Sequence, residues 1–329
     1  MEFLNREDLF LKINSLAKKN VPFLFLLDFK GETGIAVEID NLAKEGISCA
    51  INGVEIGQRV DTDKQQYDNY ELQTKPISFN QYKKGFDIVQ QAIQNGDTYL
   101  LNLTYATLIT SKLDMCSIYQ KAKAPYKFMI KDKFVFYSPE PFIRISNGIV
   151  SSFPMKGTIS IKENDAYFKL LNDEKELREH YTIVDLIRND LSIISTDVEV
   201  ESFRYFEKIQ TAKDVILQTS SKITGHLKDN WNEEFGNILK KIVPAGSISG
   251  APKKRSVEII EKAEITDRGF YSGVMGVYNN YSVDSCVIIR YIEKNKDSYC
   301  YRSGGGITSN SKAKEEYNEL LTKIYVPTN

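Results

Sequence analysis

Histidine and cysteine are scarce in this sequence of 329 residues, and their scarcity argues against several kinds of site. The two histidines, His180 and His226, leave little material for a histidine metal site or a Ser-His-Asp triad. The four cysteines lie far apart and form no CxxC pair, which argues against a disulfide framework and a thiolate metal site. Acid–base chemistry must therefore fall mainly to carboxylates, lysine or tyrosine.

An excess of charge of either sign is also missing. The 43 basic and 44 acidic side chains give a net charge of −1, so the chain has no field suited to a nucleic-acid backbone or an anionic membrane. No apolar run approaches the ~20 residues that cross a bilayer. The first residues lack the basic and apolar regions of a signal peptide. We expect a cytoplasmic protein that binds neither nucleic acid nor membrane.

What the sequence does contain is the composition of a globular protein, with 42% hydrophobic and 26% charged residues. Apolar patterns predict strands at residues 99–105, 285–292 and 298–302 and a helix at residues 174–191. Strands and helices come in unequal clusters, which favours a mixed α+β fold over a doubly wound parallel sheet. Because no repeat or Pro/Ser-rich linker interrupts the chain, we expect residues 1–329 to form a single unit.

The stretch around Lys156 is the first candidate for chemistry. An apolar strand at residues 148–153 runs into Pro154, which cannot donate to a ladder and favours a turn. Lys156 then precedes Gly157, which allows close approach of the backbone to a bound molecule, and Thr158 adds a hydroxyl. A lysine held partly out of water on such a turn could act as an amine nucleophile. The alternative is a surface turn with a solvated lysine.

Four further stretches combine polar groups with glycine. Residues 179–190 carry more charge than a helix needs for solubility, although a solvated acidic face is the simpler interpretation. Residues 244–253 form a Gly/Ser turn that feeds a helix, which suits an anion or is an ordinary capped turn. Residues 302–307 include three consecutive glycines, which could allow backbone contact with a ligand or form a flexible turn. Glu319 and Lys323 lie four residues apart. They could form a surface ion pair, or Glu319 could bind a hard cation with Lys323 as a base beside it.

Taken together, these stretches resemble the chorismate-utilising enzymes. The likeness runs from about Asp97 to Lys323, and its landmarks follow the family order: residues 96–103, 138–140, 154–158, 179–190, 246–253, 271–273, 289–290, 304–307 and 316–323. It implies an anthranilate synthase-like sandwich of two facing β-sheets with helices on the outside and the active site between the sheets. Residues 96–325 would form the catalytic core, and residues 1–75 a weakly matched N-terminal part.

The resemblance also implies roles for single residues. Glu179 and Glu319 would hold Mg²⁺, and oxygen-only ligation of a hard cation suits a chain poor in histidine. The substrate chorismate, with its two carboxylates, would be bound by the remaining matched positions, which are Gly157, Thr158, Ser249, Tyr271, Arg290, Gly304, Gly305, Gly306 and Lys323. Lys156 and Glu140 would be the catalytic residues.

Within the family, Lys156 favours aminodeoxychorismate synthase component I. Anthranilate and isochorismate synthases usually carry alanine at this position, and the water-activating lysine of isochorismate synthases is replaced here by Leu100. The resemblance implies that Lys156 attacks C2 of chorismate while Glu140 protonates the departing C4 hydroxyl. Ammonia then adds at C4 and gives 4-amino-4-deoxychorismate, a precursor of p-aminobenzoate and folate. The ammonia would come from a separate glutamine amidotransferase subunit.

Two alternatives stay open from the sequence. The first is another Mg²⁺-dependent chorismate enzyme, chiefly anthranilate synthase component I. The second is a non-catalytic relative that binds chorismate or serves as a partner subunit, which the intact set of Lys156, Glu140, Glu179 and Glu319 disfavours. One departure from the family pattern is Gln218, which stands where many relatives have histidine.

Overall fold

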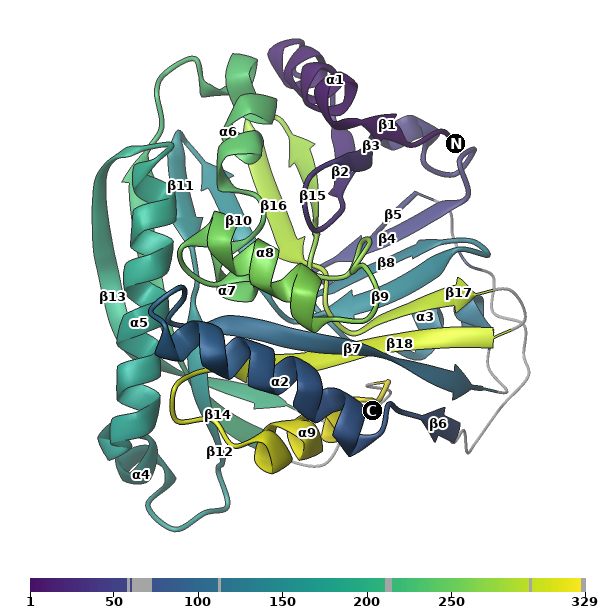
Figure 1. Ribbon diagram of the computed structural model, residues 1–329. Coiled ribbons are helices and arrows are strands. Elements are labelled where there is room, and N and C mark those ends of the chain that lie inside the picture. Colours follow the sequence, from purple (N-terminus) through teal and green to yellow (C-terminus); the bar gives the residue numbers. More distant parts are fainter. Residues whose placement is uncertain (58–59, 61–72, 112–113, 211–214, 296–297, 327–329) are drawn as a thin grey trace.

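Two antiparallel sheets form the frame of the protein (Figure 1). The computed structural model describes residues 1–57, 60, 73–111, 114–210, 215–295 and 298–326. Within these residues, ten strands make the first sheet, in the order β1 (Leu4–Asn5), β3 (Thr33–Glu38), β2 (Phe23–Leu27), β15 (Val274–Asn279), β16 (Ser282–Val287), β10 (Pro141–Ser146), β11 (Ile149–Ser152), β14 (Val215–His226) and β12 (Met155–Ser160), with β13 (Thr196–Gln210) also paired to β14. The second sheet has the order β5 (Val54–Gly57), β4 (Ile47–Ile51), β8 (Tyr126–Ile130), β9 (Phe134–Ser138), β17 (Tyr291–Asn295), β18 (Ser298–Ile307), β7 (Leu101–Thr110) and β6 (Gln73–Lys75).

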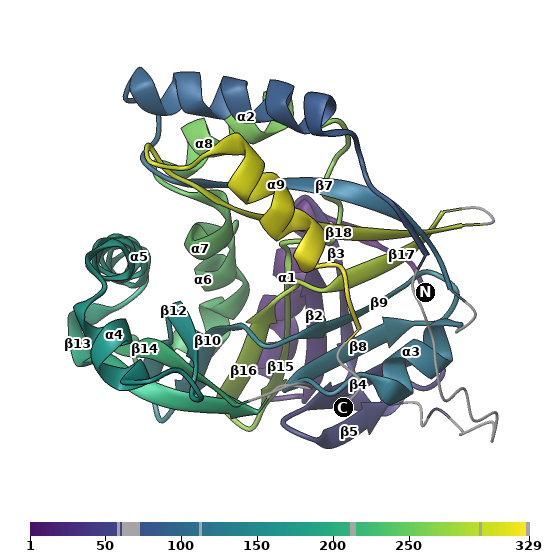
Figure 2. The ribbon, with the colours of Figure 1, turned by 90° about the horizontal axis from the view of Figure 1, so that it is seen from below.

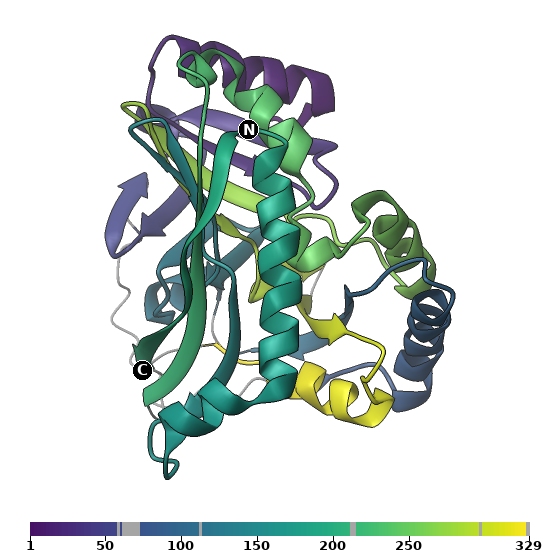
Figure 3. The same cartoon turned by 90° about the vertical axis from the view of Figure 1, so that its left-hand side faces the viewer.

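Helices cover the outer faces of both sheets. Figure 2 shows α2 (Phe79–Gln94), α8 (Lys253–Ala263) and α9 (Ala313–Thr322) along the outside of β7 and β18. In Figure 3, α5 (Glu174–Ser192) runs along the long strands β13 and β14, with α4 (Ala166–Asn172) at one end. The remaining helical segments are α1 (Arg6–Lys18), α3 (Met115–Lys121), α6 (Phe235–Ile242), α7 (Gly246–Ser249) and two 3₁₀ turns at Ile39–Asn41 and Trp231–Glu234.

The strand β2 shows how the layers are joined. All five of its residues are apolar and fully buried, because the strand is covered on both faces. Phe23, Phe25 and Leu27 point toward the cluster under α1 and α6, whereas Leu24 and Leu26 point toward the second sheet, where they meet residues such as Phe128. The inner faces of the two sheets therefore share one apolar core.

The predicted mixed α+β fold of two facing sheets is confirmed, but several predicted elements differ in detail. Residues 285–292 are not one strand: β16 ends at Val287 in the first sheet and β17 begins at Tyr291 in the second. The chain crosses between the sheets here, and Arg290 has a left-handed backbone with φ of +56°. The strand predicted at residues 298–302 is longer, because β18 continues through all three glycines to Ile307.

Candidate active site

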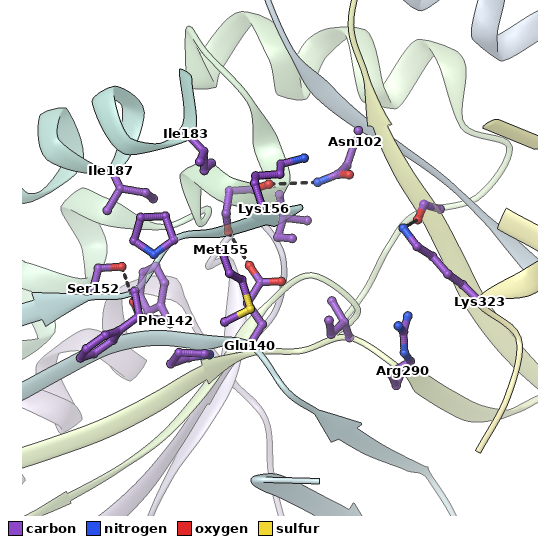
Figure 4. Close-up of a pocket in the computed structure, with 18 of the residues that line it drawn as sticks. Asn102, Glu140, Phe142, Ser152, Met155, Lys156, Ile183, Ile187, Arg290 and Lys323 are labelled. Atoms are coloured by element: carbon purple, nitrogen blue, oxygen red, sulfur yellow. Dashed lines mark hydrogen bonds between the residues drawn. The ribbon is translucent and has the colours of Figure 1, made fainter. Parts of the chain in front are cut away.

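Lys156 lies on β12, an edge strand of the first sheet. The prediction that it stands on a turn is wrong, because the ladder breaks only at Phe153-Pro154 and pairing with β14 resumes at Met155. The register of β12 shifts between Lys156 and Thr158, at Gly157, whose φ of +77° suits glycine. Such a bulge redirects the neighbouring side chains. Figure 4 shows the Lys156 side chain among the groups that line a pocket.

The amine of Lys156 contacts the helix α5. Its Nζ atom lies 3.3 Å from Oε2 of Glu179, and both side chains are largely shielded from solvent, at 29% and 23% exposed. Lys175, one turn earlier on α5, lies 3.9 Å from the other oxygen of the same carboxylate. The Lys156 amine is therefore held at the site by a carboxylate that the sequence predicts to bind a metal.

Glu140 is fixed by hydrogen bonds from two directions. Its backbone N–H donates to Ser138 Oγ at 3.1 Å, and its Oε1 atom accepts a bond of 2.8 Å from Ser247 Oγ. Burial raises the pKa of the Glu140 carboxyl, and the bond from Ser247 and the nearby positive side chains oppose this only in part. A carboxyl with a raised pKa retains its proton closer to neutral pH, as a general acid requires.

Asn102, the polar residue inside the apolar strand β7, holds the segment that carries Ser247. Its Nδ2 atom donates to the Ser247 carbonyl at 3.0 Å, and its own carbonyl accepts a bond of 2.6 Å from Arg268. Arg268 is only 1% exposed and pairs with Glu264, which also pairs with Arg302. A buried charged cluster thus supports the strand directly behind the pocket.

Tyr271 and Arg290 come from the connections on either side of the β15–β16 hairpin. Tyr271 is buried, which raises the pKa of its hydroxyl and keeps it a neutral hydrogen-bond donor. Arg290 stands at the crossing between the sheets, and its guanidinium lies beside the pocket (Figure 4). A planar guanidinium with five donors is suited to bind a carboxylate.

The glycines of β18 lie against α9 and Lys156. Lys323 donates to the Gly304 carbonyl at 3.0 Å and to Glu319 at 2.6 Å. A Cβ atom on Gly305 would lie 3.0 Å from Oε1 of Glu319, and one on Gly306 would lie 3.9 Å from Lys156 Nζ. A side chain at Gly305 would crowd Glu319, and one at Gly306 would lie 3.2 Å from Cδ1 of Leu100, so glycine at these positions leaves the backbone accessible to a ligand.

A cavity of about 210 Å³ lies at the centre of this site (Figure 4). The predicted site residues among its walls are Glu140, Lys156, Tyr271, Arg290, Gly304, Gly306, Glu319 and Lys323. In Figure 4, Ile183 and Ile187 of α5 border the cavity on the side away from Arg290 and Lys323. The cavity thus combines an apolar wall with positive groups opposite.

Five predicted residues do not line this cavity. Glu179 contacts Lys156 and Gly305 packs on Glu319, so both remain next to it. Gly157 faces Leu170 and Glu176, and Thr158 is exposed on β12. Ser249 is fully buried and donates its hydroxyl to the Ala245 carbonyl, because the short helix α7 turns it inward; Ser247, two residues earlier, reaches the cavity instead.

Each of the two glutamates predicted to bind a metal, Glu179 and Glu319, has a second glutamate nearby on its helix that the sequence analysis did not identify. Glu176 and Glu179 lie three apart on α5, and Glu316 and Glu319 lie three apart on α9. Burial raises the pKa of Glu176 and of Glu316, and the neighbouring carboxylate of each pair raises it further. A hard cation would relieve this repulsion, and the carboxylates offer the oxygen ligands that it prefers. In the described part of the chain, however, no three acidic, histidine or cysteine side chains converge as a ready metal site.

Other residues of the sequence motifs have structural roles. The ring of His180 is fully buried with Nε2 2.6 Å from Ser221 Oγ, and burial lowers the pKa of His180 to about 4, so it stays neutral. Asp190 and Lys253 form an ion pair of 2.8 Å that joins α5 to the start of α8. The motifs at residues 179–190 and 244–253 are thus joined in space by this pair.

The comparison with known families matches residues 35–329 to the model of the chorismate binding enzymes. The chain belongs to this family. A protein of Haemophilus influenzae named "Uncharacterized PabA-like protein" is 44% identical over 314 residues, which cover 95% of this chain and 94% of that protein. Anthranilate synthase component 1 of Acetivibrio thermocellus is 32% identical over 76% of this chain, and aminodeoxychorismate synthase component 1 of Bacillus subtilis is 29% identical over 76%. The chain spans about half the length of these two synthases, 52% and 55%.

Solved structures of chorismate enzymes share the fold. Anthranilate synthase component I from Streptococcus pneumoniae superposes with a TM-score of 0.66 at 27% identity, covering 77% of this chain and 58% of that one. The menaquinone-specific isochorismate synthase of Escherichia coli has a TM-score of 0.75 at 15% identity and covers 98% of this chain and 82% of its own. These chorismate-enzyme folds agree with the two-sheet architecture. None of the described helices combines the length and apolar character needed to span a membrane.

Proposed function

We propose that this chorismate binding enzyme aminates chorismate to 4-amino-4-deoxychorismate through a covalent bond to Lys156. The observation that carries the proposal is the placement of the Lys156 amine and the Glu140 carboxyl on one cavity, with a raised pKa at Glu140. A nucleophile and a proton donor at one cavity are the pair that such a displacement needs.

The proposed reaction has two steps. In the first, the Lys156 amine forms a bond to C2 of chorismate and loses a proton, the two ring double bonds shift to C1–C6 and C4–C5, and the C4 hydroxyl leaves as water with a proton from Glu140. In the second, ammonia forms a bond to C4 and gives a proton to Glu140, the two double bonds shift back to C5–C6 and C1–C2, and the Lys156–C2 bond breaks as the amine is released. The sum consumes chorismate and ammonia and releases aminodeoxychorismate and water.

Other groups would bind and orient the substrate. Arg290, Lys323 and the Tyr271 hydroxyl would hold the carboxylates, and Ile183 with Ile187 would cover the ring. Glu179 and Glu319, with Glu176 and Glu316 beside them, would hold Mg²⁺ in place of the lysine partners that they have here. When bound, the ion would polarise the substrate.

Leu100 supports amination over addition of water. Its Cδ1 atom lies 3.2 Å from the position of a Cβ on Gly306, next to the Lys156 amine. An apolar side chain at this place cannot activate a water molecule.

The decisive experiment is intact-protein mass spectrometry after mixing the enzyme with chorismate and Mg²⁺ without ammonia. We expect an adduct with the mass of chorismate less water, mapped to Lys156 and absent from Lys156→Ala and from samples with chelator. An enzyme that turns over chorismate and ammonium without any adduct, and with full activity in Lys156→Ala, would refute the covalent role.

Anthranilate synthesis is the second candidate, because the Acetivibrio synthase is slightly more similar, at 32% identity, than the Bacillus aminodeoxychorismate synthase, at 29%. Product analysis separates the two reactions. Anthranilate is fluorescent and forms with release of pyruvate, whereas aminodeoxychorismate releases pyruvate only after a lyase is added.

A further inference from the structure

Besides lining the cavity, the guanidinium of Arg290 contacts a residue outside the motifs of the family, Tyr325. Its Cζ atom lies 5.0 Å from the centre of the Tyr325 ring, and Nη2 is 3.4 Å from the Tyr325 hydroxyl. A ring face at this distance attracts a cation. Arg290 therefore contacts Tyr325 and also lines the cavity.

The segment that carries Tyr325 is fixed by other residues. The Tyr325 carbonyl accepts hydrogen bonds from the hydroxyls of Tyr137, at 2.9 Å, and Tyr301, at 3.1 Å, and both of these rings are fully buried. The neighbours Ile324 and Val326 pack into the same apolar cluster. The backbone position of Tyr325 is thus set without help from its own ring, which is 44% exposed.

Arg290 stands at the crossing from β16 to β17 with φ of +56°, outside either strand. An arginine side chain has many rotamers, and holding it in one of them costs conformational entropy. A stacked ring restricts the guanidinium before a ligand arrives, so less entropy is lost on binding.

We propose that Tyr325 is a positioning residue that orients Arg290 toward a carboxylate of the substrate. The short stretch 323–325 then supplies two contributions to anion binding, the Lys323 ammonium and the orientation of the Arg290 guanidinium. This proposal depends on the proposed function in one respect only: both assume that chorismate supplies the carboxylate that Arg290 binds.

Kinetics of Tyr325→Ala and Tyr325→Phe test this role. We expect Tyr325→Ala to raise the KM for chorismate about tenfold, equivalent to about 1.4 kcal/mol of binding, which lies within the range of a partly shielded cation–π contact. The KM for ammonium and the melting temperature should stay unchanged, because nearly half of Tyr325 is exposed and the bonds to its backbone carbonyl remain. Tyr325→Phe keeps the ring and should restore most of the affinity. The matched control is Tyr281→Ala, which removes a ring of similar exposure, 49%, on the β15–β16 turn.

Chemical labelling tests the contact without any substrate. Phenylglyoxal reacts with accessible guanidinium groups, and peptide mass spectrometry reads its reaction at Arg290. Labelling of Arg290 should be faster in Tyr325→Ala than in the wild type and in Tyr281→Ala. Unchanged labelling, an unchanged KM for chorismate, or a joint change of both KM values and the melting temperature would each overturn the positioning role. If the wild type does not turn over chorismate, the proposed function fails, and the labelling result still decides the role of Tyr325.

Discussion

At the scale of single residues, Glu140 is the group whose protonation the structure makes most testable. Burial raises its pKa, and the hydrogen bond from Ser247 lowers it by stabilising the charged carboxylate. In the proposed role of general acid, Glu140 would act below its pKa, so kcat/KM should fall as the pH rises through that value.

Ser247→Ala should move this falling limb to higher pH. Without the Ser247 donor the carboxylate is less stable relative to the acid, and the pKa of Glu140 rises further. The measurement is the pH profile of chorismate turnover with saturating ammonium. Glu140→Gln should remove the limb and lower turnover by roughly 10²–10⁴-fold. Ser192→Ala, which removes an exposed hydroxyl bonded to the Arg188 carbonyl, is the control. A limb that stays in place or moves to lower pH contradicts the assignment.

Residues with a distinctive local sequence could be predicted, and those defined by distant partners could not. Lys156, two residues after Pro154, and the triple glycine of β18 are visible in the sequence, and Lys156, Gly304 and Gly306 line the cavity. Ser247 and Tyr325 were missed because their partners, Glu140 and Arg290, are 107 and 35 positions away. Asn102 gave a signal, as a polar residue in an apolar strand, but its partner Ser247 lies 145 positions away.

At the scale of helices and strands, the ion pair between Asp190 and Lys253 explains two motifs at once. The Asp190 side chain is 8% exposed and that of Lys253 is 20% exposed, and Lys253 also donates to the Ile242 carbonyl at 2.7 Å. The pair joins α5, which carries Glu179, to the α7–α8 region, which carries Ser247. It therefore links the two sides of the site.

Asp190→Ala should destabilise the fold by about 3 kcal/mol, because it leaves the Lys253 charge largely buried without its partner. The midpoint of urea unfolding measures the change. Arg178→Ala is the control, since it breaks a highly exposed pair with Glu174 on the same helix and should have little effect. An equal shift of the urea midpoint in both variants would show that the buried pair stabilises the fold no more than the exposed pair does.

The elements themselves were predicted best where one pattern continues without interruption. The helix expected at residues 174–191 matches α5 closely, because its apolar residues recur with helical spacing along one buried face. The strand expected at residues 285–292 was wrong, since continuous apolar residues do not reveal where a chain leaves one sheet for another. Buried strands of two sheets have the same apolar composition.

At the scale of the whole molecule, the cavity depends on both sheets. Lys156 comes from an edge strand of the first sheet, the β18 glycines come from the second, and Arg290 lies where the chain crosses between them. Neither the strand order nor this meeting point follows from local sequence, because neighbouring strands such as β7 and β18 are far apart in the chain. The resemblance to a family supplied the two-sheet arrangement that local patterns could not.

At the same scale, the proposed amination requires ammonia, and the cysteines and histidines of the chain do not suit its release from glutamine. Burial raises the pKa of all four cysteine thiols, whereas a nucleophilic cysteine needs a lowered pKa. Of the two histidines, His180 is buried and neutral. We therefore expect the purified chain to aminate chorismate with ammonium and to be nearly inactive with glutamine alone.

Chromatography of the product, at fixed pH and matched ionic strength, measures this difference between the two nitrogen sources. Adding a glutamine amidotransferase subunit should restore activity with glutamine, because the ammonia that it releases reaches the same cavity. Lys156→Ala should lose the covalent route with either source, which shows that both use one site. Release of glutamate from glutamine by the purified chain alone would contradict the expectation, because it would require a nucleophile that the described thiols do not provide.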